Sequence, residues 1–244
     1  KETLNSFGIN VANSDLNLSL ALGSMKNGID MFSLVNAYSI LANDGINKGW
    51  TFIDRIENEQ GKPIYLREKF QEKVASAEDC FLLTDMLKET ASTGTARRLN
   101  DLNLPIASKT GTASNKNGNT DLFNVSYTTE NTILTWVANI SGTYLPKETY
   151  SSVEPTQINK QILQSLYEDH VPNDFIVPNG VVKCEYDLIK LEEENILEKP
   201  NHSIERYIAS DYFKLTNMPK DAIEDEKTTE EVKVTKFAPV SNHD

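Results

Sequence analysis

The residues best suited to chemistry in this 244-residue sequence form one short string, Lys109-Thr110-Gly111-Thr112. A lysine places a positive charge that attracts a substrate carboxylate and can lower the pKa of neighbouring proton-transfer groups. Threonine hydroxyls can hydrogen-bond that carboxylate, and a glycine lets a substrate backbone approach closely, which a Cβ would hinder. On an edge strand, a backbone N–H of the string can donate to the oxyanion that develops during acyl transfer. On a surface turn, Lys109 would simply be a solvated charge, and the tripeptide alone leaves both interpretations open.

Other chemical signatures are missing from the sequence. It has no His-Glu-x-x-His, Walker, dinucleotide-binding or Cys-x-x-Cys motif. Its two cysteines, Cys80 and Cys184, are far apart and its three histidines are scattered, which indicates neither a zinc site nor a disulfide framework. We therefore expect no metal and no cofactor.

The charge of the chain also limits the kinds of partner that it can bind. The formal net charge is −12, and no basic stripe is present, which argues against nucleic acid and anionic membrane surfaces as partners. The longest apolar run, 132–138, is far shorter than the roughly 18 residues that a spanning helix needs, so we expect no membrane contact by this segment. Two windows, 185–199 and 221–235, each hold six acids and two lysines, so most of the negative charge is local.

Three helices and three strands are predicted around the string. Apolar residues recur at helical spacing in the segments 31–44, 76–90 and 155–169. Gly45 follows the first helix, where a left-handed C-cap would lie, and Ser76 offers an N-cap hydroxyl to the second. β-like runs at 104–112, 122–128 and 132–140 predict three antiparallel strands. The fold class is therefore α+β, with helices packed on an antiparallel sheet.

The remaining segments predict smaller features. Residues 51–53 and 63–65 flank the turn 58–61 and predict a short surface hairpin. Prolines punctuate the chain beyond His170, so 171–218 is expected to form a small appendage that is irregular or β-like. Few large apolar residues occur in 219–244, which predicts an acidic linker or disordered tail.

Lys109-Thr110-Gly111 resembles the third motif of the serine acyl-enzymes that act on penicillin and on D-alanyl peptides. Thr93-Gly94-Thr95-Ala96 before it, Asp121-Leu122-Phe123 after it and the segment 20–45 are similar to penicillin-binding proteins in the same order and spacing. This resemblance implies that residues 1–170 are the C-terminal part of a transpeptidase domain with the penicillin-binding, serine β-lactamase-like fold.

Two later segments, 175–182 and 207–219, resemble the tail of the bifunctional class A enzymes, which carry a glycosyltransferase domain upstream. By this resemblance the reaction is D,D-transpeptidation of peptidoglycan stem peptides, with β-lactams as further ligands, at the extracytoplasmic face of the plasma membrane. Lys109 and the backbone N–H of Thr112 would be catalytic. Thr110, Gly111 and Thr112 would bind the substrate.

The sequence departs from the family in one decisive respect. The family attacks with a serine whose base is a lysine three positions later, and it has a second motif, Ser-x-Asn. No serine in this chain is followed by lysine at the third position or by asparagine at the second. We therefore expect an upstream half of the same protein to supply both motifs, and the chain alone to be inactive and marginally stable. Smaller departures are Ser108, where many relatives have glycine, and Leu122, at a position that is often aromatic.

Two alternatives accompany this interpretation. A serine β-lactamase shares the lysine motif, but such enzymes end soon after their final helix, whereas roughly 75 residues follow Asp169 here. A degenerate, non-catalytic member could serve as a cell-wall binding or scaffolding module. The missing serine motif supports that second alternative, and truncation explains the missing motif equally well.

Overall fold

A computed structural model describes residues 1–202 and 204–221 of the chain. The chain divides into two compact units, Lys1–Val182 and Lys183–Asp244. The predicted boundaries after residues 170 and 218 stay predictions. The tail expected at 219–244, with most of the second acidic window, lies outside the described residues apart from 219–221.

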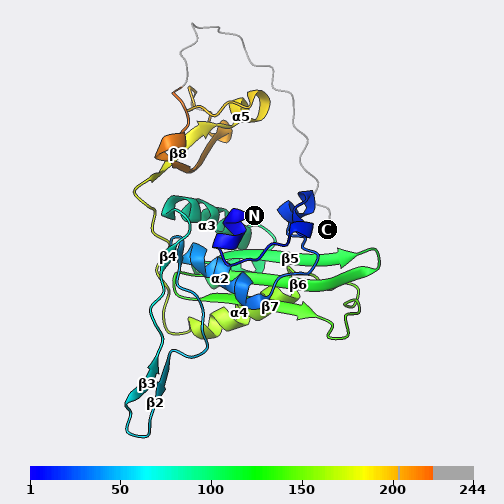
Figure 1. The fold of residues 1–244 in the computed structure, drawn as a ribbon. Helices are drawn as coiled ribbons and strands as arrows, with labels where there is room; N and C mark the ends of the chain where they lie inside the picture. Colours follow the sequence, from blue (N-terminus) through cyan, green and yellow to red (C-terminus); the bar gives the residue numbers. More distant parts are fainter. Residues whose placement is uncertain (203, 222–244) are drawn as a thin grey trace. The chain divides into compact units, whose positions relative to one another are not determined.

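The first unit is organised around a three-stranded antiparallel sheet (Figure 1). Its strands are β5 (Ala107–Asn115), β6 (Gly118–Tyr127) and β7 (Thr132–Ala138), in the order β5-β6-β7. The prediction of helices on an antiparallel sheet is confirmed, and β5, which carries the lysine motif, is an edge strand.

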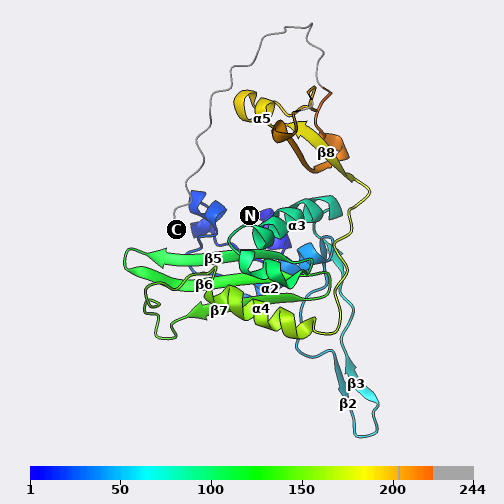
Figure 2. The same ribbon diagram turned by 180° about the vertical axis from the view of Figure 1, so that it is seen from behind.

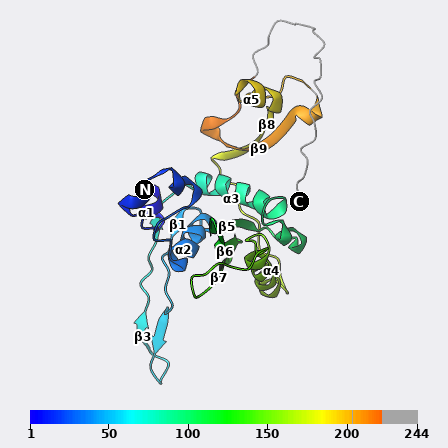
Figure 3. The ribbon, with the colours of Figure 1, turned by 90° about the vertical axis from the view of Figure 1, so that its right-hand side faces the viewer.

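Three helices pack around this sheet. They are α2 (Met31–Ala42), α3 (Ala77–Ser92) and α4 (Glu154–Leu166), close to the three predicted helices. Viewed along the strands, α2 lies on one face of the sheet, α4 on the other and α3 beside β5 (Figure 3). Figure 2 shows α4 crossing in front of β6 and β7. Between α3 and β5 the chain forms a 3₁₀ segment, η3 (Arg97–Leu102).

Local sequence explains where these helices begin and end. The Ser76 hydroxyl accepts a hydrogen bond from the backbone N–H of Asp79 at 3.0 Å, which is the predicted N-cap of α3. After α3 the chain turns at Gly94, where an added Cβ would lie 2.8 Å from the Cα of Thr90. Only glycine fits that turn. Gly45 adopts the left-handed conformation expected of it, with φ of +83°.

The predicted hairpin exists, but its first strand was placed wrongly. The strands are β2 (Arg55–Glu57) and β3 (Pro63–Leu66), so residues 51–53 are not a strand. Trp50 and Phe52 instead pack on Phe32 of α2, with ring centroids 4.9 and 5.1 Å away. Aromatic packing has displaced the strand by several residues toward the turn, and the hairpin extends away from the sheet (Figure 1).

The core of the first unit consists of three clusters. The first packs Ile9 and Val11 against Ala37 of α2, and the other two lie around the sheet. One joins α3, η3 and α4 through Ala91, Leu99, Ile106, Leu163 and Tyr167. The other joins Leu87, Ala107 and Tyr127, with Tyr38 and Leu41 of α2 packed against them. The motif strand is therefore held from both faces by tertiary packing.

Short elements complete the first unit. They are α1 (Glu2–Ser6), η1 (Asn13–Asp15), η2 (Leu18–Leu22), and the paired strands β1 (Ile46–Asn47) and β4 (Glu72–Lys73).

The second unit contains regular elements where an irregular or β-like appendage was expected. A strand pair is formed by β8 (Val181–Asp187), which begins at the end of the first unit, and β9 (Ile208–Lys214). The others are α5 (Leu188–Glu194), η4 (Glu205–Tyr207) and η5 (Leu215–Asn217). Across the described parts of both units, no helix is long and apolar enough to cross a membrane.

Candidate active site

The lysine motif lies in the first half of the edge strand β5. Side chains on a strand alternate between the two faces of the sheet. Ser108 is fully buried, whereas its neighbour Lys109 is exposed. The exposed ammonium of Lys109 donates to the backbone carbonyl of Thr110 at 2.8 Å. Lys109 is therefore accessible at the surface of the strand, and its contact with a carboxylate stays a prediction.

Thr110 is more enclosed than its proposed role suggests. Its side chain is buried, with 8% of its surface exposed, and its Oγ1 lies 2.8 Å from Oγ1 of Thr95, in the turn between α3 and η3. A threonine hydroxyl has one donor and two acceptor positions. The Thr95 contact uses one of these positions, so a substrate contact by Thr110 has to be made beside it.

Gly111 has no internal packing reason to be glycine. Its φ is not in the left-handed region, and an added Cβ would lie 3.5 Å from Cβ of Phe123, an ordinary van der Waals contact. The fold itself therefore tolerates a side chain here.

Thr112 is exposed and its hydroxyl donates to Oγ of Ser151 at 2.9 Å. Ser151 precedes α4, so this bond ties the end of the motif to the loop that leads into that helix. The motif thus contacts two segments besides its own sheet, the turn that contains Thr95 and the loop that contains Ser151.

A buried polar network lies behind the motif, between the sheet and α4. It consists of Ser108, Asn124, Ser126 and Asn159, each with no exposed surface. The Asn159 amide donates to the backbone carbonyl of Asn124 at 3.0 Å and to Oγ of Ser126 at 3.1 Å. Ser108 donates to the carbonyl of Val125 at 2.8 Å. Buried polar groups that are fully hydrogen-bonded fix one geometry, because any shift leaves one unsatisfied.

Sequence reasoning missed Thr95 as a contact of the motif and also missed Ser151, Asn124 and Asn159. Asn159 could have been found from the sequence. It is a polar residue on the buried face of α4, one turn after Pro155 and one turn before Leu163. Thr95 and Ser151 gave no such signal, because 15 and 39 residues separate them from their partners.

On the other face of the sheet, apolar packing surrounds the end of the strands at Ala107 and Tyr127. Burial raises the pKa of the Tyr127 hydroxyl and also that of Tyr38. Tyr127 is fully buried and its hydroxyl lies 2.9 Å from Oγ1 of Thr84. These groups are neutral at physiological pH, so they support the motif strand by packing rather than by proton transfer.

In the part of the chain that the structure describes, the motif is accompanied neither by a serine of the Ser-x-x-Lys type nor by a group of metal ligands. None of the chain's serines has a lysine three positions later. Among the residues that the structure describes, no three His, Cys, Asp or Glu side chains are grouped as metal ligands. The described residues place a cation and hydroxyls on an edge strand, and these are groups that can hydrogen-bond a carboxylate.

Comparison with known proteins decides the family of this fold. Residues 6–164, well over half of the chain, match the family described as the penicillin binding protein transpeptidase domain. The chain belongs to this transpeptidase family. The matched residues contain the motif strand, the Thr95 turn and most of α4.

Relatives of this transpeptidase segment are full-length penicillin-binding proteins. Penicillin-binding protein 1A of Clostridium novyi is 26% identical over 189 residues, which cover 75% of this chain and 21% of that protein. Penicillin-binding protein 2a of Streptococcus pneumoniae is 30% identical over 136 residues, 55% of this chain and 17% of that protein. The chain thus spans about a fifth of the length of the relatives it matches.

Solved structures share the fold of the transpeptidase segment. Penicillin-binding protein 1A from Haemophilus influenzae matches with a TM-score of 0.70 and 16% identity, over 90% of this chain and 37% of that one. PonA1 from Mycobacterium tuberculosis matches with a TM-score of 0.62 and 18% identity, over 74% of this chain and 55% of that one. At these identities the likeness establishes the fold.

Proposed function

We propose that this chain is the motif-bearing part of a peptidoglycan D,D-transpeptidase of class A, which also binds β-lactams. One observation carries the proposal: Lys109-Thr110-Gly111-Thr112 lies on the edge strand of the sheet in a chain that belongs to the transpeptidase family. PonA1, which shares the fold with a TM-score of 0.60 in this form, has been solved in complex with penicillin V.

The proposed reaction proceeds in two acyl transfers. A serine hydroxyl, deprotonated by its lysine, attacks the carbonyl of the D-alanyl-D-alanine bond and D-alanine leaves with the proton. The amine of a second stem peptide then attacks the acyl-enzyme and releases the serine as the new peptide bond forms. The serine, its lysine and the Ser-x-Asn motif come from an upstream part of the same protein.

Each motif residue has a defined part in this scheme. The ammonium of Lys109 attracts the terminal carboxylate of the donor peptide, or that of a β-lactam, and favours the deprotonated serine electrostatically. The hydroxyls of Thr110 and Thr112 hydrogen-bond that carboxylate. Gly111 lets the substrate backbone lie against β5, and the backbone N–H of Thr112 donates to the tetrahedral oxyanion, a contact typically worth 10²–10³ in rate.

The cellular setting follows from the family. Cross-linking of stem peptides takes place outside the cytoplasm, so we place the full protein at the extracytoplasmic face of the plasma membrane. An upstream glycosyltransferase domain would make the glycan strands that this domain cross-links.

Labelling with a fluorescent penicillin tests the proposal. The full protein should be labelled at a serine outside these 244 residues, and the chain alone should not be labelled. Lys109→Ala in the full protein should lower the labelling rate by about 100-fold or more, because the carboxylate of the penicillin loses the cation that holds it in place for acylation. Lys116→Ala, which removes an exposed lysine just beyond the strand, is the matched control and should label normally.

Two results would contradict the proposal. If the Lys109→Ala variant is labelled as fast as the wild type, Lys109 has no role in acylation. If the full protein and its Lys116→Ala variant are both folded but neither binds penicillin covalently, the protein is better explained as a non-catalytic module that binds the cell wall.

A further inference from the structure

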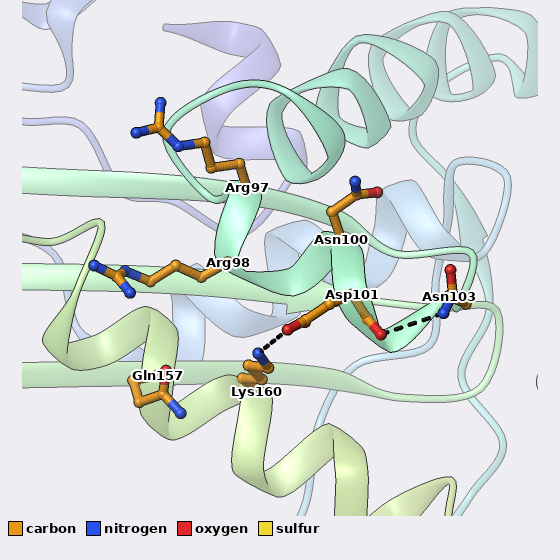
Figure 4. Close-up of a pocket in the computed structure, with 7 residues that line it drawn as sticks. All are labelled: Arg97, Arg98, Asn100, Asp101, Asn103, Gln157 and Lys160. Carbon is orange, nitrogen blue, oxygen red and sulfur yellow. Dashed lines mark hydrogen bonds and ion pairs between the residues drawn. The ribbon is translucent and has the colours of Figure 1, made fainter.

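A polar pocket lies between η3 and α4, apart from the lysine motif. It has a volume of about 410 Å³ and is lined by seven residues, none of which belongs to the motif. They are Arg97, Arg98, Asn100, Asp101, Asn103, Gln157 and Lys160 (Figure 4). Every one of these side chains is polar or charged, and none is aromatic or purely aliphatic, so the pocket is built to hold a polar ligand.

The lining of this pocket is strongly positive in a chain whose net charge is −12. The ammonium of Lys160 pairs with the carboxylate of Asp101 at 2.6 Å. The two arginines are left without a carboxylate partner among the described residues. The pocket thus carries about two uncompensated positive charges.

The two arginines are also arranged for a ligand. Nε of Arg98 donates to the backbone carbonyl of Ser152 at 3.0 Å, which fixes its guanidinium and leaves its terminal N–H groups free. Arg97 makes no hydrogen bond or ion pair with the part of the chain that the structure describes. Figure 4 shows both side chains extending to the same side of η3, with Gln157 on the facing helix.

We propose that this pocket binds a phosphate group. Guanidinium forks match the oxygens of phosphate, and two of them balance the double negative charge that a phosphate monoester carries near neutral pH. A carboxylate would balance only one. The side-chain amides of Asn100 and Gln157 supply further hydrogen-bond donors on the rim of the pocket.

A nucleotide base is disfavoured as the rest of the ligand, because no lining side chain is aromatic. The ligand is therefore either free phosphate or the phosphate group of a hydrophilic monoester. The site shares no residue with the lysine motif, although Arg98 binds the carbonyl of Ser152, next to the Ser151 hydroxyl that Thr112 contacts. Phosphate binding is measured without penicillin, so the two proposals can fail separately.

Phosphate titration of the full protein, followed by ³¹P NMR, tests this site with inorganic phosphate as the probe. Arg97→Ala should weaken binding by about tenfold, the equivalent of one lost charge-assisted hydrogen bond. Arg97 has no partner in the described chain, so its loss should not disturb folding. The double variant Arg97→Ala/Arg98→Ala should abolish measurable binding. Lys116→Ala/Lys147→Ala removes the same charge from exposed positions elsewhere and should bind as the wild type does.

Removal of an acidic side chain from the pocket should change the phosphate affinity in the opposite direction. Asp101→Asn frees Lys160 to face the ligand and should tighten phosphate binding severalfold, whereas Glu168→Gln, at an exposed position outside the pocket, should have no effect. Phosphate binding that is equally strong in Arg97→Ala, in the double variant and in the wild type would overturn the proposal. So would an affinity that Asp101→Asn leaves unchanged.

A second ligand distinguishes the sources of the phosphate. If glycerol 3-phosphate binds as tightly as inorganic phosphate, the pocket accepts the terminal phosphate of a larger hydrophilic molecule. If only inorganic phosphate binds, the pocket takes the free ion. Both outcomes require the arginine dependence stated above, and the absence of binding by both ligands contradicts the site.

Discussion

The side-chain amide of Asn159 donates a hydrogen bond to the backbone carbonyl of Asn124 at 3.0 Å, inside the protein and directly behind the motif strand. This bond joins α4 to β6, the strand that pairs with β5 residue by residue from Lys109 opposite Val125 to Thr112 opposite Leu122. Through β6, the position of α4 is linked to the geometry of the motif, so Asn159 is a positioning residue for the site.

Replacing Asn159 by leucine should loosen this arrangement. Leucine fills a similar volume but removes the donor to the buried carbonyl of Asn124 and the acceptor of the half-buried Thr135 hydroxyl. Unsatisfied buried polar groups cost about 1–3 kcal/mol each, so we expect a loss of about 3 kcal/mol in the free energy of unfolding. Hydrogen exchange followed by mass spectrometry should also show faster exchange in the peptide that contains residues 107–115.

Gln164→Leu is the matched control, because Gln164 lies on an exposed position of the same helix and has no buried partner. It should leave exchange of the motif strand unchanged. Equal exchange in the Asn159→Leu variant and the wild type would show that the network does not position β5.

Gly111→Ala should separate folding from function. The added Cβ would make only an ordinary contact, 3.5 Å from Cβ of Phe123, so the melting temperature should stay close to that of the wild type. On the outer side it would obstruct the approach of the substrate backbone to the edge strand. We therefore expect penicillin acylation to slow by about tenfold or more, since small misplacements in a site cost factors of this size.

Ala113→Ser adds one atom at an exposed position of the same strand, two residues beyond the glycine, and serves as the control. It should be acylated at the wild-type rate. A Gly111→Ala variant that melts normally and is acylated as fast as Ala113→Ser would remove the argument for close backbone approach at Gly111.

The elements that periodicity specifies were predictable from the sequence, and the contacts between distant elements were not. The three strands were expected from β-like runs, of which only 122–128 alternates in character, and α3 follows from the Ser76 cap and its apolar stripe. The strand expected at 51–53 was wrong because packing of Trp50 and Phe52 on Phe32 outweighs the β propensity of the segment. Such a contact between distant residues cannot be predicted from the local sequence.

The candidate site, like the fold, could be predicted from the sequence only in part. Its residue types and its place on a strand were readable, because Lys-Thr-Gly-Thr is local. The partner of Thr110 was not, because Thr95 reaches it only after α3, η3 and β5 have packed together. Polar residues such as Asn124 look like surface positions until α4 supplies the partner that makes their burial favourable.

A double-mutant cycle should measure the bond between Tyr127 and Thr84 on the other face of the sheet. Both residues are buried, and their hydroxyl oxygens lie 2.9 Å apart. Tyr127→Phe leaves the Thr84 hydroxyl unsatisfied and should lower the free energy of unfolding by about 2 kcal/mol. Adding Thr84→Val removes the orphaned hydroxyl and should restore part of that loss. Strictly additive losses in urea unfolding would show that the two hydroxyls do not interact.

The two cysteines should differ sharply in reactivity. Cys80 is 1% exposed, and burial, followed by the nearby carboxylates Asp44 and Asp79, raises the pKa of its thiol to about 11. Only the thiolate reacts, so at pH 8 the Cys80 thiol is almost entirely in its unreactive neutral form, and the reagent also lacks access to it. Cys184 is partly exposed in β8. Brief alkylation of the native protein, mapped by mass spectrometry, should modify Cys184 and spare Cys80, whereas both should react in urea. Equal modification of the two thiols in the native protein would contradict the packing of Cys80 in α3.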